Sequence, residues 1–127
     1  MIDHVSVPVR DLAAAGAFYQ RLLEPLGYAR LVTRSGTIGF GKKYPELWLN
    51  LRRDLAAAPN DPGGHIALRA GSEEAVRAFH AAALAAGGTS AGKPGPRQAA
   101  RTTYFGAFIL DPDGNKLEAI TFSAPSP

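Results

Sequence analysis

Three residues of this sequence, His4, His65 and Glu118, have side chains that can bind a metal ion or act as an acid or base. Each lies in a short segment in which apolar residues alternate with other residues, a pattern that predicts a β-strand with one buried face. Alternate side chains of a strand point to opposite faces, so we expect the three residues on the faces that the apolar side chains leave open. Two imidazoles and one carboxylate converging from three strands would leave coordination positions free on a divalent ion such as Fe, Mn, Ni, Co or Zn. That arrangement is typical of a catalytic metal site.

An internal repeat gives the two histidines a common position. For either histidine alone, the simpler interpretation is a polar residue on a half-exposed sheet, and Glu118 would then be a solvated strand residue. However, residues 4–27 align without a gap to residues 65–88. The aligned pairs include Ala14 with Ala75, Ala17 with Ala78, Phe18 with Phe79, and Leu23 with Leu84. The sequence therefore predicts an internal duplication, which favours a shared role for His4 and His65.

Each copy is predicted to begin with a strand that runs directly into a helix. Asp11 and Ser72 stand where the helices should start, and their side chains can accept hydrogen bonds from the free N–H groups of the first turn. Apolar residues then recur at three- and four-residue spacing, which gives each helix one buried face. Strands are expected at residues 2–9, 28–34, 37–42 and 47–53 in the first copy and at residues 64–70, 102–110 and 116–122 in the second.

Residues 89–101 are the least regular part of the second copy. Their prolines and glycines predict a loop with at most a fragment of strand. The motif "DPDGN" at residues 111–115 predicts a tight turn between the last two strands. Residues 54–64 are expected to link the copies, and residues 123–127 to form a frayed tail. The predicted fold class is α+β, with two tandem βαβββ modules at about residues 1–54 and 64–123.

Length and composition narrow the classes of function. A chain of 127 residues is expected to form a single domain. Its 14 Lys and Arg against 11 Asp and Glu leave a net charge of +3, a low density for a dedicated nucleic-acid binder. The absence of cysteine excludes disulfides, thiolate metal sites and thiol nucleophiles. Without a signal peptide or a long apolar run, the chain is expected to be soluble and cytoplasmic, with no membrane partner.

The repeat and its motifs resemble the vicinal oxygen chelate superfamily, which includes glyoxalase I, fosfomycin-resistance thiol transferases, extradiol dioxygenases and bleomycin-resistance proteins. The resemblance covers nearly the whole chain and rests on "IDHVSV", "HIALRA" and the closing "DPDGNKLEAI". It implies that His4, His65 and Glu118 are ligands of a divalent metal ion. It also implies that the modules form an open, eight-stranded, barrel-like sheet around the metal, often completed across a homodimer.

The branches of the superfamily differ in ways that bear on activity. Glyoxalase I takes a fourth ligand, usually Glu, from the last strand of the first module, where this chain has "LWLNL" and offers Trp48 or Asn50. Trp cannot ligate, and Asn50 would be a weak oxygen ligand. Ser6 resembles a Thr that the fosfomycin transferases place near the epoxide, but their acidic, Ser-rich potassium loop is replaced by "RQAARTTYF". Extradiol dioxygenases usually have a chain about twice as long, and bleomycin-resistance proteins generally lack the three ligands.

Further residues on the predicted open faces could shape a substrate pocket. Trp48 and Phe108 could form apolar walls, and Tyr104 could donate a hydroxyl proton. Arg52, Arg69 and Arg101 could contact an anion. Each has a simpler interpretation, as a packing aromatic residue or a solvated arginine. His80 is interpreted as a half-buried packing residue of the second helix.

We therefore expect a metal-dependent lyase, transferase or dioxygenase in which the ion binds two adjacent oxygens of a small, anionic substrate. Glu118, Tyr104 and Ser6 are the candidate catalytic groups. The alternative is a metal-free dimeric protein that sequesters a hydrophobic or aromatic compound between two subunits, in a cavity lined by Trp48, Phe108 and Tyr104.

Overall fold

The first half of the chain folds as a βαβββ module in the computed structural model, which describes residues 1–59 and 63–122. Residues 60–62 of the predicted linker and the predicted tail, 123–127, lie outside the described residues. The elements are β1 (Val5–Val9), α1 (Leu12–Leu23), the short 3-10 helix η1 (Glu24–Leu26), β2 (Ala29–Thr33), β3 (Thr37–Gly41) and β4 (Pro45–Leu51). The strand order is β1-β4-β3-β2, with β1 parallel to β4 and the other pairs antiparallel.

The second half repeats this plan. Its elements are β5 (Ile66–Arg69), α2 (Glu73–Ala85), β6 (Thr89–Gln98), β7 (Thr103–Leu110) and β8 (Lys116–Thr121). The strand order is β5-β8-β7-β6, again with a parallel first pair. The α+β class and the two βαβββ units agree with the sequence prediction. The two four-stranded sheets are separate, and they do not close into a barrel.

Both helices begin at the predicted capping residues. Asp11 accepts a hydrogen bond of 3.0 Å from the backbone N–H of Ala14, and Ser72 accepts one of the same length from Ala75. These bonds satisfy N–H groups that have no partner within the helix. Gly27 follows η1 with φ at +84°, a backbone conformation that favours glycine. Both helices therefore begin at a side-chain cap, and the first helical segment ends at a glycine.

The prediction of a loop over residues 89–101 is wrong for most of that segment. Residues Thr89–Gln98 form β6, a ten-residue strand paired with β7. The strand tolerates Pro94 and Pro96 because β6 is an edge strand, where a missing N–H costs no ladder bond if it points outward. Its pairing register shifts on both sides of Gly92, which accommodates the irregular sequence.

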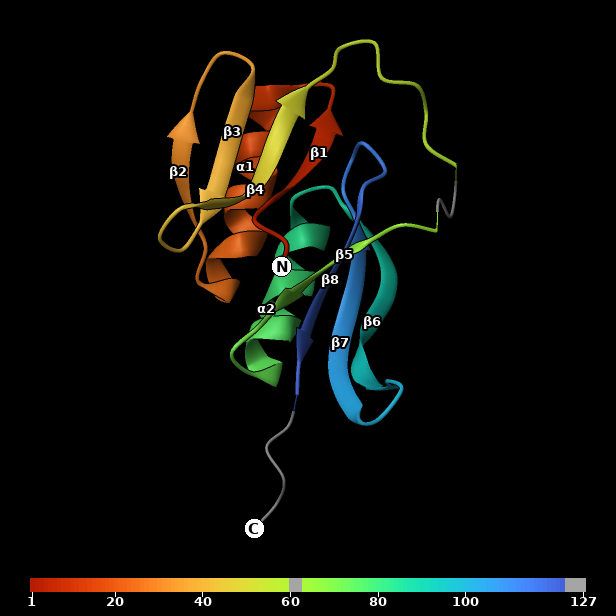
Figure 1. The fold of residues 1–127 in the computed structure, drawn as a ribbon. Helices are drawn as coiled ribbons and strands as arrows, with labels where there is room; N and C mark the ends of the chain where they lie inside the picture. The colour runs from red at the N-terminus through yellow and green to blue at the C-terminus, as the bar shows by residue number, and fades with distance from the viewer. Residues whose placement is uncertain (60–62, 123–127) are drawn as a thin grey trace.

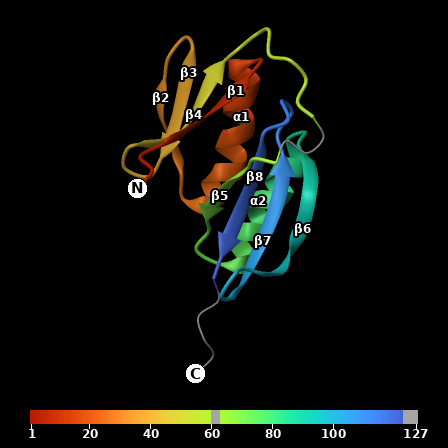
Figure 2. The same cartoon turned by 45° about the vertical axis from the view of Figure 1, so that its right-hand side comes forward.

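Each helix covers one face of its own sheet. Helix α1 packs on β2, β3 and β4, and α2 packs on β6, β7 and β8. The two helices also pack against each other (Figures 1 and 2). The buried side chains of both modules form one hydrophobic core. The opposite face of each sheet, here called the open face, carries no helix within the described residues. None of the described helices has the length and apolar character needed to cross a membrane.

A polar cluster, here called the inter-module clasp, joins the "DPDGN" turn to the first module. Its members are Tyr19, Asp111, Asn115, Arg10 and Asp113. The Tyr19 hydroxyl donates to Asp111 Oδ2 at 2.5 Å, and the Asn115 side chain donates to the Pro8 carbonyl at 2.8 Å. Arg10 forms a salt bridge of 2.9 Å with Asp113. The turn that leads into β8 is thus held directly by α1 and the end of β1.

Candidate functional site

His65 and Glu118 lie together on the open face of the second sheet. His65 Nε2 is 3.2 Å from Glu118 Oε1, although the residues are far apart in sequence. Strand β8 lies between β5 and β7, and it pairs Glu118 with Ala67 on one side and with Phe108 on the other. The central position explains why Glu118 is only 3% exposed. His65 directly precedes β5, so its ring reaches the carboxylate from the sheet edge.

Tyr104 contacts the second oxygen of the same carboxylate. Its hydroxyl donates to Glu118 Oε2 at 3.0 Å. Burial raises the pKa of the Tyr104 phenol, and the hydrogen bond and negative charge of Glu118 raise it further, while Arg97 opposes them. The phenol therefore keeps its proton at neutral pH and acts as a donor.

Gly106 allows these two side chains to meet. It lies on β7 between Tyr104 and Phe108 and faces the same way. A Cβ at this position would stand 3.0 Å from the Tyr104 ring and 3.1 Å from Glu118 Oε2. Any larger residue would therefore push the phenol away from the carboxylate. The role of this glycine could not be predicted from the sequence, because it depends on the register of β7 and β8.

Phe108 borders His65 and Glu118, here called the pair. Positively charged or ionisable groups surround its ring. Its ring meets the His65 imidazole edge-on at 5.2 Å between centroids. The Arg97 guanidinium lies 5.4 Å from the ring centroid, and the Lys116 ammonium lies 5.0 Å from it. Neither cation is among the site residues predicted from the sequence. Lys116 could have been found, because it precedes Glu118 by two residues and shares its face.

His4 stands apart from this group. Its Nδ1 lies 2.6 Å from Asp3 Oδ1, and both side chains are largely exposed. His4 and His65 do line one pocket, of about 350 Å³, between the start of β1 and β5. Within residues 1–59 and 63–122, however, no three His, Cys, Asp or Glu side chains come close enough together to hold a metal ion. One chain thus brings two of the three predicted ligands into contact.

The sequence profile of the Glyoxalase/Bleomycin resistance protein/Dioxygenase superfamily matches residues 1–119. The chain belongs to this superfamily. No curated protein matches the sequence.

Solved structures of other superfamily members share the fold. A glyoxalase/bleomycin resistance protein from Albidiferax ferrireducens T118 is 33% identical, with a TM-score of 0.82 over 93% of this chain and 96% of that one. A family enzyme from Burkholderia phytofirmans PsJN is 19% identical, with a TM-score of 0.72 over 96% and 98% of the two chains. The fosfomycin resistance protein FosX from Listeria monocytogenes is 19% identical, with a TM-score of 0.67 over 94% and 91%. The likenesses at 19% identity concern the fold alone.

The duplicated superfamily fold identifies the residue in the first module that corresponds to Glu118. Strand β8 pairs Glu118 with Ala67, and β4 pairs Trp48 with Ser6, which is the repeat equivalent of Ala67. Trp48 rather than Asn50 therefore occupies the carboxylate position. Its ring lies against Gly39, where a Cβ would come within 2.9 Å of the indole. The first module of this superfamily member thus has an aromatic side chain where the second has an acid.

The remaining predicted residues lie at differing distances from the pair. Ser6 is exposed on β1 and lines a pocket of about 280 Å³ with His65 and Lys116. The Arg69 guanidinium stacks on Phe122, whose ring is 6.0 Å from Tyr104. Asn50 is half-buried on β4.

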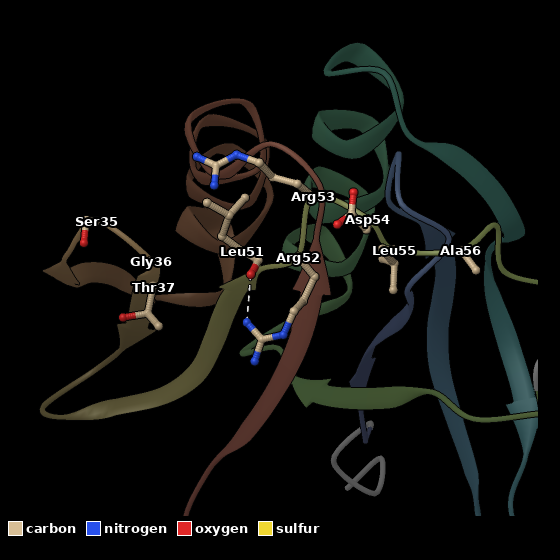
Figure 3. Close-up of a pocket in the computed structure, with 9 residues that line it drawn as sticks. All are labelled: Ser35, Gly36, Thr37, Leu51, Arg52, Arg53, Asp54, Leu55 and Ala56. Atoms are coloured by element: carbon tan, nitrogen blue, oxygen red, sulfur yellow. Dashed lines mark hydrogen bonds between the residues drawn. The ribbon is translucent and has the colours of Figure 1, made fainter.

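Two predicted anion contacts lie elsewhere. Arg101 is exposed in the turn between β6 and β7. Arg52 lines a broad depression at the far end of β4, where it donates to the Leu51 carbonyl (Figure 3). The depression includes Arg53 and Asp54 but none of the predicted metal ligands. His80 is buried on α2, with Nε2 2.8 Å from Ser90 Oγ, which suits a packing role.

Proposed function

We propose that this protein is a divalent-metal-dependent enzyme that acts on a small anionic substrate with two adjacent oxygen atoms. The observation that carries the proposal is the buried Glu118 carboxylate, which contacts the His65 imidazole through one oxygen and the Tyr104 hydroxyl through the other. Burying a carboxylate is unfavourable unless it is paired, so a buried acid on an otherwise open face favours a functional role over a structural one.

The donor set fits a borderline divalent ion. Two ligands at about 2.1 Å from one ion and at right angles to each other stand roughly 3 Å apart. The 3.2 Å between His65 Nε2 and Glu118 Oε1 is close to that spacing. His65 and Glu118 would hold Fe, Mn, Ni, Co or Zn, with His4 as the third ligand. When bound, the ion would supply Lewis-acid chemistry by polarising the oxygens of the substrate.

The chain's own side chains would bind and orient the substrate, and one of them would donate a hydrogen bond. Tyr104 directs its hydroxyl at Glu118 Oε2, and its raised pKa keeps the phenol protonated at neutral pH, so it serves there as a hydrogen-bond donor. Phe108 shields one side of the pair from water. Ser6, near His65 at the boundary between the modules, could orient a substrate hydroxyl.

A homodimer would complete the site. His4 is exposed, and Asp3 fixes one of its ring nitrogens, which leaves Nε2 directed elsewhere. We propose that His4 of one chain meets His65 and Glu118 of a second chain across the open faces. Unpaired strand edges and uncovered sheet faces also favour association of two copies.

A metal-free binding protein is the second candidate. It is favoured by the absence of a three-ligand group among the described residues and by the aromatic side chains of Trp48, Tyr104 and Phe108 on the open faces. Such a protein would enclose a hydrophobic or aromatic compound between two subunits.

Metal binding separates the two candidates. The purified protein is stripped with a chelator and titrated in turn with Fe²⁺, Mn²⁺, Ni²⁺, Co²⁺ and Zn²⁺ in a calorimeter, and we expect at least one of these ions to bind at about one per chain. Glu118→Gln should abolish binding. Glu46→Gln is the matched control, because Glu46 lines the same pocket as both histidines yet is expected to leave binding unchanged. A wild type that binds none of the five metals would refute the enzyme proposal and favour the second candidate.

Mixed dimers test whether the site is shared. His4→Ala and Glu118→Gln should each fail to bind the metal alone. When the two variants are mixed and allowed to exchange subunits, a mixed dimer should bind one metal ion. One of its two shared sites then combines an intact His4 with an intact His65 and Glu118. A site contained within one chain would stay broken in every combination, and that result would exclude the shared arrangement.

A further inference from the structure

Two cations flank the aromatic ring beside His65 and Glu118. Lys116 comes from β8 and Arg97 from β6, the two strands on either side of β7, which carries Phe108. We propose that Lys116 and Arg97 form an anion-binding subsite that recognises the carboxylate or phosphonate group of the substrate. This inference rests on the proposed function, because the subsite borders the same pair, and it replaces Arg52 and Arg101 as the expected anion contacts.

Within residues 1–59 and 63–122, neither cation forms a salt bridge. The salt bridges among the described residues join Asp3 to His4, Arg10 to Asp113, His65 to Glu118, and Glu73 to Arg77. Lys116 and Arg97 take part in none of them. Glu118, the nearby acid, already accepts from Tyr104 and contacts His65. The open face therefore keeps uncompensated positive charge next to the pair, which attracts an anion.

Arg97 is fixed in position before any ligand arrives. Its guanidinium donates to three backbone carbonyls, those of Lys93, Gly95 and Gly106. Gly92 makes room for it, since a Cβ there would stand 2.9 Å from the guanidinium. Stacking on Phe108 further restricts the side chain. A cation held in one conformation loses little side-chain entropy on binding, so it binds an anion more effectively than a mobile surface arginine.

Lys116 places charge where a ligand of the pair would lie. It shares the face of Glu118 two residues away on β8, and it lines the pocket of about 280 Å³ with Ser6 and His65. A small molecule in this pocket would touch the imidazole and the ammonium group together. The pocket is thus suited to a ligand with a chelating end near His65 and an anionic end at Lys116. Arg97 does not line the pocket and lies against the same Phe108 ring as Lys116.

The test uses the metal-free chain, so that it does not depend on metal binding. Benzoate, phenylphosphonate and the neutral analogue benzamide are titrated into the chelator-treated, isotope-labelled protein, and binding is followed by amide chemical shifts. We expect the two anions to bind more tightly than benzamide. Lys116→Gln should weaken anion binding about five-fold, as expected for the loss of one partly screened charge. Lys116→Arg should restore it. Benzamide binding should not change in either variant.

Arg101→Gln is the matched control, because it removes the same charge from a neighbouring exposed turn and is expected to have no effect. Arg97→Met should also weaken binding, but its contacts with three carbonyls could alter β6, so Lys116 carries the test. Tighter binding of phenylphosphonate than of benzoate would identify a phosphonate as the preferred group. Tighter binding of benzoate would identify a carboxylate. Equal binding of anions and benzamide, no binding of any probe, or an equal loss in Arg101→Gln would overturn the proposal. Metal titration of the same sample reports separately on the proposed function.

Discussion

The two modules share their element order and strand order, yet equivalent positions on their open faces differ in chemistry. In the second module β8 carries Glu118, which lies beside Phe108 on β7. In the first module the same positions hold Trp48 and Gly39, and the indole covers the glycine. The face that each sheet turns towards its helix is apolar in both modules. The buried faces therefore keep the duplicated scaffold, whereas the open faces differ in chemistry.

The helices differ in a similar way at one buried position. Tyr19 of α1 and His80 of α2 are equivalent in the repeat. The Tyr19 hydroxyl crosses to Asp111 of the other module, whereas His80 contacts Ser90 in its own module. At this position the first helix forms a hydrogen bond with the second module, whereas the second helix forms one within its own module.

Removing the centre of the inter-module clasp should give the largest effect. Asp111→Ala would leave the Tyr19 hydroxyl and the N–H groups of Asp113 and Asn115 without their acceptor. We expect the free energy of unfolding in urea to fall by roughly 3 to 5 kcal/mol. Asp54→Ala is the control: it changes an exposed aspartate and should lower the free energy of unfolding only slightly. A loss below about 1 kcal/mol for Asp111→Ala would show that the modules do not depend on the clasp.

Deleting a single hydroxyl should give an intermediate effect and isolate the cross-module bond. Tyr19→Phe removes the donor to Asp111 from a fully buried site, and we expect a loss of about 1 to 2 kcal/mol in unfolding free energy. Tyr28→Phe is the control, because it makes the same chemical change at a half-buried position. An equal loss of unfolding free energy in the two variants would show that the hydrogen bond from Tyr19 to Asp111 adds no particular stability.

The smallest effect should appear in the pH dependence of stability. Burial lowers the pKa of His80 from its ordinary 6.5, and the positive charge of Arg97 adds to this. The unfolded chain therefore binds the proton more tightly, so this contribution to stability is present above about pH 6.5 and is lost as the pH falls through the lowered folded-state value. Tyr19 does not titrate there, since burial raises its pKa well above 10. His80→Gln should flatten the decline in melting temperature between pH 7 and pH 5, and an unchanged slope would exclude His80 as its source.

Local patterns predicted most elements of the fold. The capping residues Asp11 and Ser72 and the repeat placed both helices, because helix starts depend on neighbouring residues. Strand β6 was missed because its prolines are acceptable only on a sheet edge, and edge position is a property of the whole topology. Arg97 was missed with it, since its place opposite Tyr104 follows from that strand.

The candidate site was predictable in part for a related reason. Alternation along β8 indicated which face carries Glu118, and the repeat aligned His65 with His4. The choice between Trp48 and Asn50 required the register of β1 and β4, which the sequence left open. The contact between Tyr104 and Glu118 depends on Gly106, whose significance is visible only across two paired strands.

The prolines of β6 also bear on how the molecule avoids self-aggregation. A free sheet edge can recruit a strand from another chain through its outward N–H and C=O groups, and proline removes N–H donors from that edge. Pro94 and Pro96 therefore make β6 a poor template for strand addition, and the described residues of β2, the corresponding edge of the first sheet, include no proline. Of these two corresponding edges, β2 is therefore the more open to strand exchange between molecules, and a proline introduced there would give it the same protection as β6.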